Sequence, residues 1–177
     1  MDSRNQSHSR HLRRPSDGWT AWQMTVGYIG QHYGPDVFLM VQVQPTDADQ
    51  FVWTASISWR QQYESGTAAE SIAAALAQLW QTMARYHKIF RSPDDAFRAP
   101  SGYAESEWLD ASTDSMLHRI LSITSAVYDQ SWRLALVYRP AEIPAERVQV
   151  RLLDADGWLH IGGSGPALLE ALRDMLR

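Results

Sequence analysis

Two stretches of this sequence share one pattern, YGPDVFLMVQVQP (residues 33–45) and YDQSWRLALVYRP (residues 128–140). Each begins with Tyr, continues through a short turn into alternating apolar residues, and ends at Pro. A constant offset of 95 residues separates them, because 33 corresponds to 128 and 45 to 140. Alternation with a period of two is typical of a half-buried β-strand. The sequence therefore predicts a repeated unit that begins with a strand.

The similarity continues in the next segment of each copy. After a polar loop, FVWTASISW (residues 51–59) and RVQVRLL (residues 147–153) alternate with the same period. At the same offset, three apolar residues in one copy correspond to three in the other: Trp53, Ala55 and Ile57 to Val148, Val150 and Leu152. A third short strand is predicted in QQYESG (residues 61–66) and in GWLHIGGSG (residues 157–165), and the second copy has the longer turn, DADG (residues 154–157).

Each copy closes with a predicted helix. The helices are TAAESIAAALAQLWQTMARY (residues 67–86) and PALLEALRDMLR (residues 166–177), and each follows a Ser-Gly pair. Thr67 is the expected N-cap, Glu70 would complete a capping box, and Pro166 is suited to a first helical turn. Each helix has one apolar stripe: Ile72, Leu76, Leu79, Trp80 and Met83 on the first, and Leu168, Leu169, Leu172, Met175 and Leu176 on the second.

A further helix is predicted before the second copy, over residues 108–128. Its apolar side consists of Met116, Leu117, Ile120, Leu121, Thr124, Val127 and Tyr128. Residues 19–32 hold the matching position before the first copy, where two glycines leave helix and strand both open. The predicted fold is α+β, built by internal duplication of a β-β-β-α unit (α-β-β-β-α in the second copy), with the helices packed on one face of an antiparallel sheet.

These elements predict a domain organisation. Residues 1–18 form a disordered tail, 19–90 the first unit, 91–107 a linker loop and 108–177 the second unit. The two units are expected to form one pseudo-symmetric domain. The alternative is two separate modules joined by residues 87–110.

The α-β-β-β-α order resembles that of the double-stranded-RNA-binding domain, best over residues 108–177 and less well over 33–86. In that family a glycine-containing turn is followed by lysines that hold phosphates at the start of the last helix. The corresponding residues here are Gly165 to Leu169 and Gly66 to Ala69, and neither stretch contains lysine. The resemblance is therefore one of topology and does not by itself assign a function.

The composition narrows the classes of function. The chain has 177 residues and no cysteine, which excludes disulfides and thiolate chemistry and suits the cytoplasmic location that we predict. The sequence has neither a long apolar run nor a secretory signal, so we expect no membrane association. Residues 1–18 carry four arginines and two aspartates, leaving twelve basic and eighteen acidic residues in the body. A small basic tail on an acidic body is not typical of a strong general nucleic-acid binder.

The best candidate for a binding site is the sheet face that the helices leave uncovered. In the second copy, alternation places Arg133, Arg139, Arg147 and Arg151 together on that face. The first copy would show Gln42, Gln44, Thr54, Ser56 and Ser58 there. Guanidinium groups bind carboxylates and phosphates, so the face is a candidate docking surface for an acidic protein or a nucleic acid. The other interpretation is an ordinary solvated face with cross-strand charges.

The sequence gives weaker indications of a metal, anion-binding, catalytic or sugar-binding site. Asp110, Asp114 and His118 lie four residues apart on a predicted helix, and His8 and His11 lie close in the tail, but neither set makes a full metal site. Residues 162–165 (GGSG) resemble an anion-binding loop, although a turn that needs glycine explains them better. The histidines at 32, 87, 118 and 160 have no nucleophile motif beside them. Trp53, Trp59 and Trp80 are expected in the core, and the other tryptophans are free to edge a sugar-binding surface.

The leading hypothesis is a non-enzymatic binding or adaptor protein with a protein partner, which uses Arg133, Arg139, Arg147, Arg151, Gln42 and Gln44. A nucleic-acid-binding module is the alternative, and an enzyme with a site assembled from distant residues is the third. We expect no metal and no cofactor.

Overall fold

The computed structural model describes all residues except 1–17, 47–49, 88–110 and 129–130. In the first half the elements are α1 (Gly18–His32), β1 (Phe38–Pro45), β2 (Phe51–Trp59), β3 (Gln62–Ser65) and α2 (Ile72–His87). In the second half they are α4 (Ala111–Val127), β4 (Arg133–Tyr138), the short 3-10 helix η2 (Pro144–Glu146), β5 (Val148–Leu153), β6 (Leu159–Gly165) and α5 (Leu168–Met175). Residues 19–32 are therefore helical. The predicted tail, apart from Gly18, and the predicted linker lie outside the described residues.

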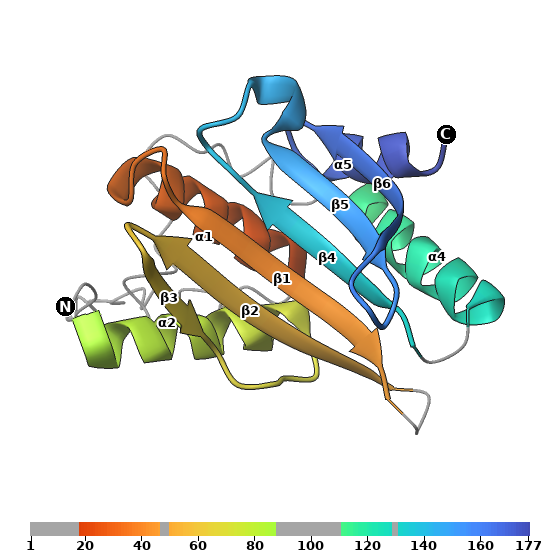
Figure 1. The fold of residues 1–177 in the computed structure, drawn as a ribbon, viewed down its shortest axis with the longest axis horizontal. Coiled ribbons are helices and arrows are strands. Elements are labelled where there is room, and N and C mark those ends of the chain that lie inside the picture. Colours follow the sequence, from red (N-terminus) through yellow and green to blue (C-terminus); the bar gives the residue numbers. More distant parts are fainter. Residues whose placement is uncertain (1–17, 47–49, 88–110, 129–130) are drawn as a thin grey trace, which may run out of the picture.

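One six-stranded antiparallel sheet joins the two halves. Its strand order is β3-β2-β1-β4-β5-β6, so the first strands of the two halves are neighbours at the centre. The four α-helices of the described residues lie on the same side of this sheet (Figure 1). The predicted α+β class with an antiparallel sheet is confirmed.

The strand registers of the two halves correspond residue by residue. In the first half Val41 pairs with Ala55, and in the second Leu136 pairs with Val150. Each residue of the second pair lies 95 positions after its counterpart in the first. The central pairing of β1 with β4 places Val41 opposite Leu136. The β1–β2 and β4–β5 pairs are therefore related by an approximate twofold axis through Val41 and Leu136.

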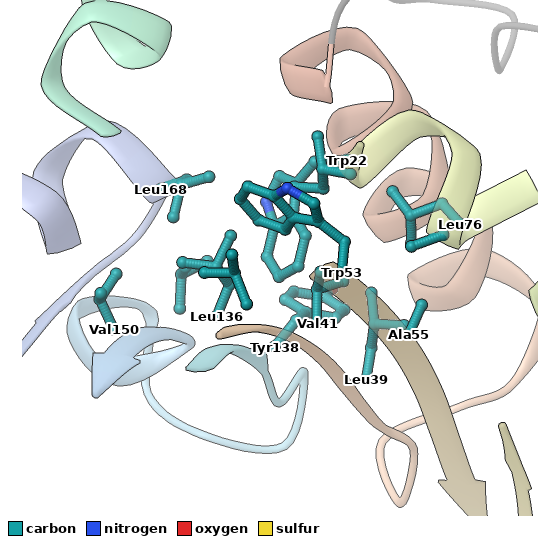
Figure 2. Packing of buried hydrophobic residues seen from close by; sticks show 14 of the residues in the cluster. Trp22, Leu39, Val41, Trp53, Ala55, Leu76, Leu136, Tyr138, Val150 and Leu168 are labelled. Atoms are coloured by element: carbon teal, nitrogen blue, oxygen red, sulfur yellow. The ribbon is translucent and has the colours of Figure 1, made fainter. Parts of the chain in front are cut away.

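The core lies between the sheet and the helices. Figure 2 shows the indole of Trp22, from α1, close to that of Trp53, from β2, with Leu76 and Leu168 of the two closing helices to either side. Among the predicted core tryptophans, Trp53, Trp59 and Trp80 are all buried, as are Trp22 and Trp132. The Trp80 indole N–H donates to Thr25 Oγ1 (3.2 Å), which links α2 to α1 inside the core.

Glycines let the closing helices approach the sheet. A Cβ on Gly66 would lie 2.7 Å from the Leu79 backbone nitrogen of α2. A Cβ on Gly163 would overlap the Ala171 carbonyl oxygen and the Met175 nitrogen of α5. Gly66 donates its N–H to Ala55, and Gly163 pairs with Val150, the residue 95 positions after Ala55. The two helices therefore contact the sheet at corresponding points.

The predicted helix starts were wrong. α2 begins at Ile72, because Ala69 forms two backbone hydrogen bonds with Trp53 and extends the sheet edge instead. The predicted capping box at Thr67 and Glu70 is absent, and Ser71 Oγ accepts the Ala74 N–H at 3.2 Å. Pro166 likewise precedes α5, whose N-cap is Ala167.

Two residues of the predicted helix stripes were also placed wrongly. Val127 at the end of α4 is 69% exposed, and Leu176 lies just beyond α5 and is 42% exposed. Val127 is the last residue of α4 and Leu176 is the C-cap of α5, so both stand at a helix end.

Candidate functional site

The sheet face that bears no helix in the described part of the chain is here called the open face. Strand alternation and cross-strand register assign the residues of its four central strands: Phe38, Met40, Gln42 and Gln44 of β1, Val52, Thr54, Ser56 and Ser58 of β2, Arg133, Ala135 and Val137 of β4, and Gln149, Arg151 and Leu153 of β5. Two rows cross its centre. Gln42 and Arg151 flank Ala135 from either side, and Met40 and Gln149 flank Val137.

The centre of the open face is apolar. Ala135 and Val137 are only 1% and 2% exposed, and both have longer residues opposite them on the two neighbouring strands. β4 is consequently buried on both of its faces. An apolar centre surrounded by polar and cationic groups differs from the simply solvated face of the alternative interpretation.

Arg151 lies on β5, and Arg139 directly follows the neighbouring strand β4 on the same face. Burial lowers the pKa of Arg151 below its ordinary value, and the positive charge of Arg139 lowers it further. Arg151 donates from Nη2 to Gln149 Oε1. The Arg139 guanidinium carbon lies 4.9 Å from the centre of the Phe38 ring, a cation–π distance. Two like charges are therefore held near each other on a partly buried surface.

Arg147 lies beside Arg139 at the same end of the sheet. The Arg139 N–H donates to the Arg147 carbonyl at 2.8 Å, one step beyond the last β4–β5 pair. Arg147 has helical backbone angles because it ends η2, so strand alternation does not define its side-chain direction. The Nε atoms of Arg139 and Arg147 are buried and have no hydrogen-bond partner in the described structure.

Among the described residues, one ion pair is formed by an arginine at this end of the sheet. Arg139 Nη1 lies 3.8 Å from Glu142 Oε1, and both side chains are more than a third exposed. An ion pair of this kind contributes only about 0–1 kcal/mol. We define Arg139, Arg147 and Arg151 as the arginine cluster.

Arg133 does not belong to the cluster. It lies at the opposite end of β4, and its Nη2 donates to the Ala155 carbonyl at 2.7 Å in the β5–β6 turn. Gln44 lies near the same end, one residue beyond the Val43–Leu134 pair, whereas Gln42 lies in the row of Arg151. The six residues predicted for the site are therefore spread over the open face, with Arg139 and Arg147 at one end, Gln42 and Arg151 in a central row, and Arg133 and Gln44 at the other end.

The other candidate sites receive little support. The described residues contain no group of three or more His, Asp or Glu side chains that could hold a metal ion. Asp110 lies outside them, as do His8, His11 and Trp108. His160 pairs with Asp154 at 3.3 Å, and both side chains are at the surface. Backbone hydrogen bonding from Trp158 is the main cause that lowers the pKa of Asp154.

Residues 162–165 belong to strand β6, so the turn predicted for them was wrong. The Ser164 N–H donates to Asp174 Oδ2 at 3.0 Å, which places the protein's own carboxylate where an anion was considered. Their glycines serve the close approach of α5 described above.

Sequence reasoning missed an exposed apolar group on the edge strand. Trp158, Leu159 and Ile161 are 74%, 58% and 44% exposed. The stretch GWLHIGG had signalled a strand, and only the strand order shows that this strand has a free edge.

Comparisons with protein-family models, with curated proteins and with solved structures found no match to this chain. Within the described residues, no helix has both the length and the apolar character needed to cross a membrane.

Proposed function

We propose that this protein is a non-enzymatic binding or adaptor protein that captures an acidic protein partner on its open face. The observation that carries the proposal is that Arg139 and Arg151 share the open face, Arg139 over the Phe38 ring at 4.9 Å and Arg151 bonded to Gln149 on the same strand. Like charges held together cost free energy unless a partner neutralises them. Carboxylates of a docked protein would do so and would provide acceptors for the buried Nε atoms.

The apolar centre supports a protein as the partner. Phe38 and Met40, which lie beside the buried Val137 and Ala135 and are themselves only partly buried, would be covered by apolar groups of the docked surface. In this arrangement the charges select the partner and orient it, and apolar burial adds affinity.

The alternative of a nucleic-acid-binding module receives less support. At the start of α5 the first turn carries the acidic Glu170, and the first turn of α2 contains Ile72 and three alanines. Neither start offers the cations that hold phosphates in the domain whose element order these halves resemble.

We further propose that the chain arose by internal duplication of an α-β-β-β-α unit. The constant offset of 95 residues, which holds for the strand motifs and for their pairing registers, supports this origin. On this view the open face combines two diverged halves, one polar and one arginine-bearing.

The experiment is a native affinity purification with and without nuclease, read by mass spectrometry. The test variant is Arg139→Gln/Arg151→Gln. The control, Arg119→Gln/Arg173→Gln, removes the same charge from exposed positions on the helices. We expect an acidic protein to be captured by wild type and control, to survive nuclease, and to be lost from the test variant. Capture that the folded test variant retains would refute the proposal, and capture that nuclease abolishes would favour the nucleic-acid alternative.

A further inference from the structure

The two edges of the sheet differ in how they are protected. Edge strands present unpaired backbone groups, and proteins usually shorten such strands or place charges on them. β3 is protected in this way: it has four residues, carries Glu64, and follows two positive-φ residues, Arg60 and Gln61. β6 at the other edge has seven residues, LHIGGSG, with no charged residue other than His160 and no proline. It also displays the exposed Leu159 and Ile161.

The backbone of β6 has groups that point away from the sheet. The Ser164 N–H donates to Asp174 on α5, so the Ser164 backbone faces away from β5. Backbone groups alternate in direction along a strand, and those of Gly162 therefore point outward as well. Asp174 caps the edge at Ser164. Among the described residues, no comparable cap is present at Gly162.

On the open face, Gly162 is the direct neighbour of Arg151 of the arginine cluster. Gly162 pairs with Arg151, and it contributes no side chain. Leu159 packs beside the vacant position, 3.6 Å from where a Cβ would stand. A strand added beyond β6 would lie two strand spacings, roughly 10 Å, from β5. A glutamate on it could pack its methylenes on Leu159 and extend its carboxylate toward Arg151.

The opposite face of an added strand would meet apolar groups. Ile161 pairs with Leu152, which is buried on the helix side, so Ile161 is directed to that side as well. Residues of the added strand that alternate with the acidic ones would therefore lie beside Ile161. The added strand should therefore alternate acidic residues, which face the arginines, with apolar residues, which face Ile161.

We propose that β6 accepts an extended segment of the acidic partner as a seventh strand, with acidic side chains on the open face and apolar side chains on the helix face. This proposal rests on the proposed function, because Arg151 belongs to both. A second copy of the chain is a poorer occupant. Its β6 contains no carboxylate with which to neutralise the arginine cluster.

The test uses the full-length protein and labelled peptides, read by fluorescence anisotropy. The probe is an acetylated (Glu-Val)4 peptide. Its comparisons are (Lys-Val)4 and a (Glu-Val)4 peptide that is N-methylated at every residue, which keeps the side chains but has no backbone N–H left on either edge with which to pair as a strand. We expect only the unmodified acidic peptide to bind. Equal binding of the N-methylated peptide, or no binding of (Glu-Val)4, would overturn strand addition.

Protein variants separate this proposal from the proposed function. Ile161→Lys should weaken binding of the (Glu-Val)4 probe at least tenfold, because lysine on an edge strand opposes strand addition. Ile123→Lys, at a similarly exposed position on α4, should leave it unchanged. If Ile161→Lys abolishes binding and Arg139→Gln/Arg151→Gln does not, strand addition stands and the arginine-face function falls. A wild-type dimer that Ile161→Lys makes monomeric would show that a second copy covers the edge, and would overturn the proposal.

Discussion

Val41 and Leu136 face each other across the central β1–β4 pair, and each is the 95-residue counterpart of the other. Both side chains are fully buried on the helix side of the sheet. They therefore share one space at the approximate twofold axis. A change in the volume of one is expected to be compensated by the opposite change in the other.

We predict that Val41→Leu and Leu136→Val each destabilise the protein, by about 1–3 kcal/mol through overpacking and about 1 kcal/mol through a cavity. The double variant should return to within about 0.5 kcal/mol of wild type. Urea denaturation of the two single variants and the double variant measures these changes in the free energy of unfolding. As a control, Val41→Leu should combine additively with Leu152→Val, because Leu152 lies on β5 and does not pair with β1. Additive losses in the Val41/Leu136 pair would contradict the shared space.

Gly163 should not tolerate a side chain. Because its Cβ would overlap the backbone of α5, Gly163→Ala should shift that helix and cost about 3 kcal/mol. Gly157→Ala provides the comparison. Gly157 has open space around it but a φ of +86°, so only backbone strain of about 1–2 kcal/mol is expected. Denaturation midpoints should rank the two variants in this order, and the reverse order would show that α5 yields easily.

Asp154 should make stability depend on pH at the β5–β6 turn. Its pKa in the folded protein is lowered, chiefly by the Trp158 backbone hydrogen bond. A lowered carboxyl pKa gives stability that is present above the unfolded value of about 4 and is lost as pH falls through the folded value. Asp154→Asn should therefore lower the urea midpoint at pH 7 and lose this difference in acid. A difference that persists at low pH would assign the effect to geometry instead of charge.

Arg151 should be a residue whose charge costs stability. Its lowered pKa shows that the charged form is disfavoured in the fold, by burial and by Arg139, and at neutral pH this cost is fully present. Arg151→Gln should leave the free energy of unfolding unchanged or raise it by a few tenths of a kcal/mol, as urea denaturation would show. Partner capture should fall. Added salt should raise the midpoint of wild type more than that of the variant. A large loss of stability would give Arg151 a structural role.

The local pattern of the sequence predicted much of the fold. The period-two segments became strands, with Leu39, Val41 and Val43 of β1 and Leu134 and Leu136 of β4 buried on the helix side, and the DADG turn holds its glycine at positive φ. The start of α2 was predicted at the wrong residue, because two backbone hydrogen bonds between Ala69 and Trp53 compete with the capping motif at Thr67. Such competition depends on a partner sixteen residues away and leaves no local signal.

The candidate site was likewise predicted only in part from the local pattern. Alternation by itself determined that Arg133 and Arg151 share the open face with Gln42, because side chains alternate strictly along a strand. Only the tertiary structure decided that Arg139 lies near Arg151, that Arg133 binds the hairpin carbonyl of Ala155, and that β6 has an unprotected edge. These relations depend on which strands become neighbours, and strand order is set by contacts between residues far apart in the chain.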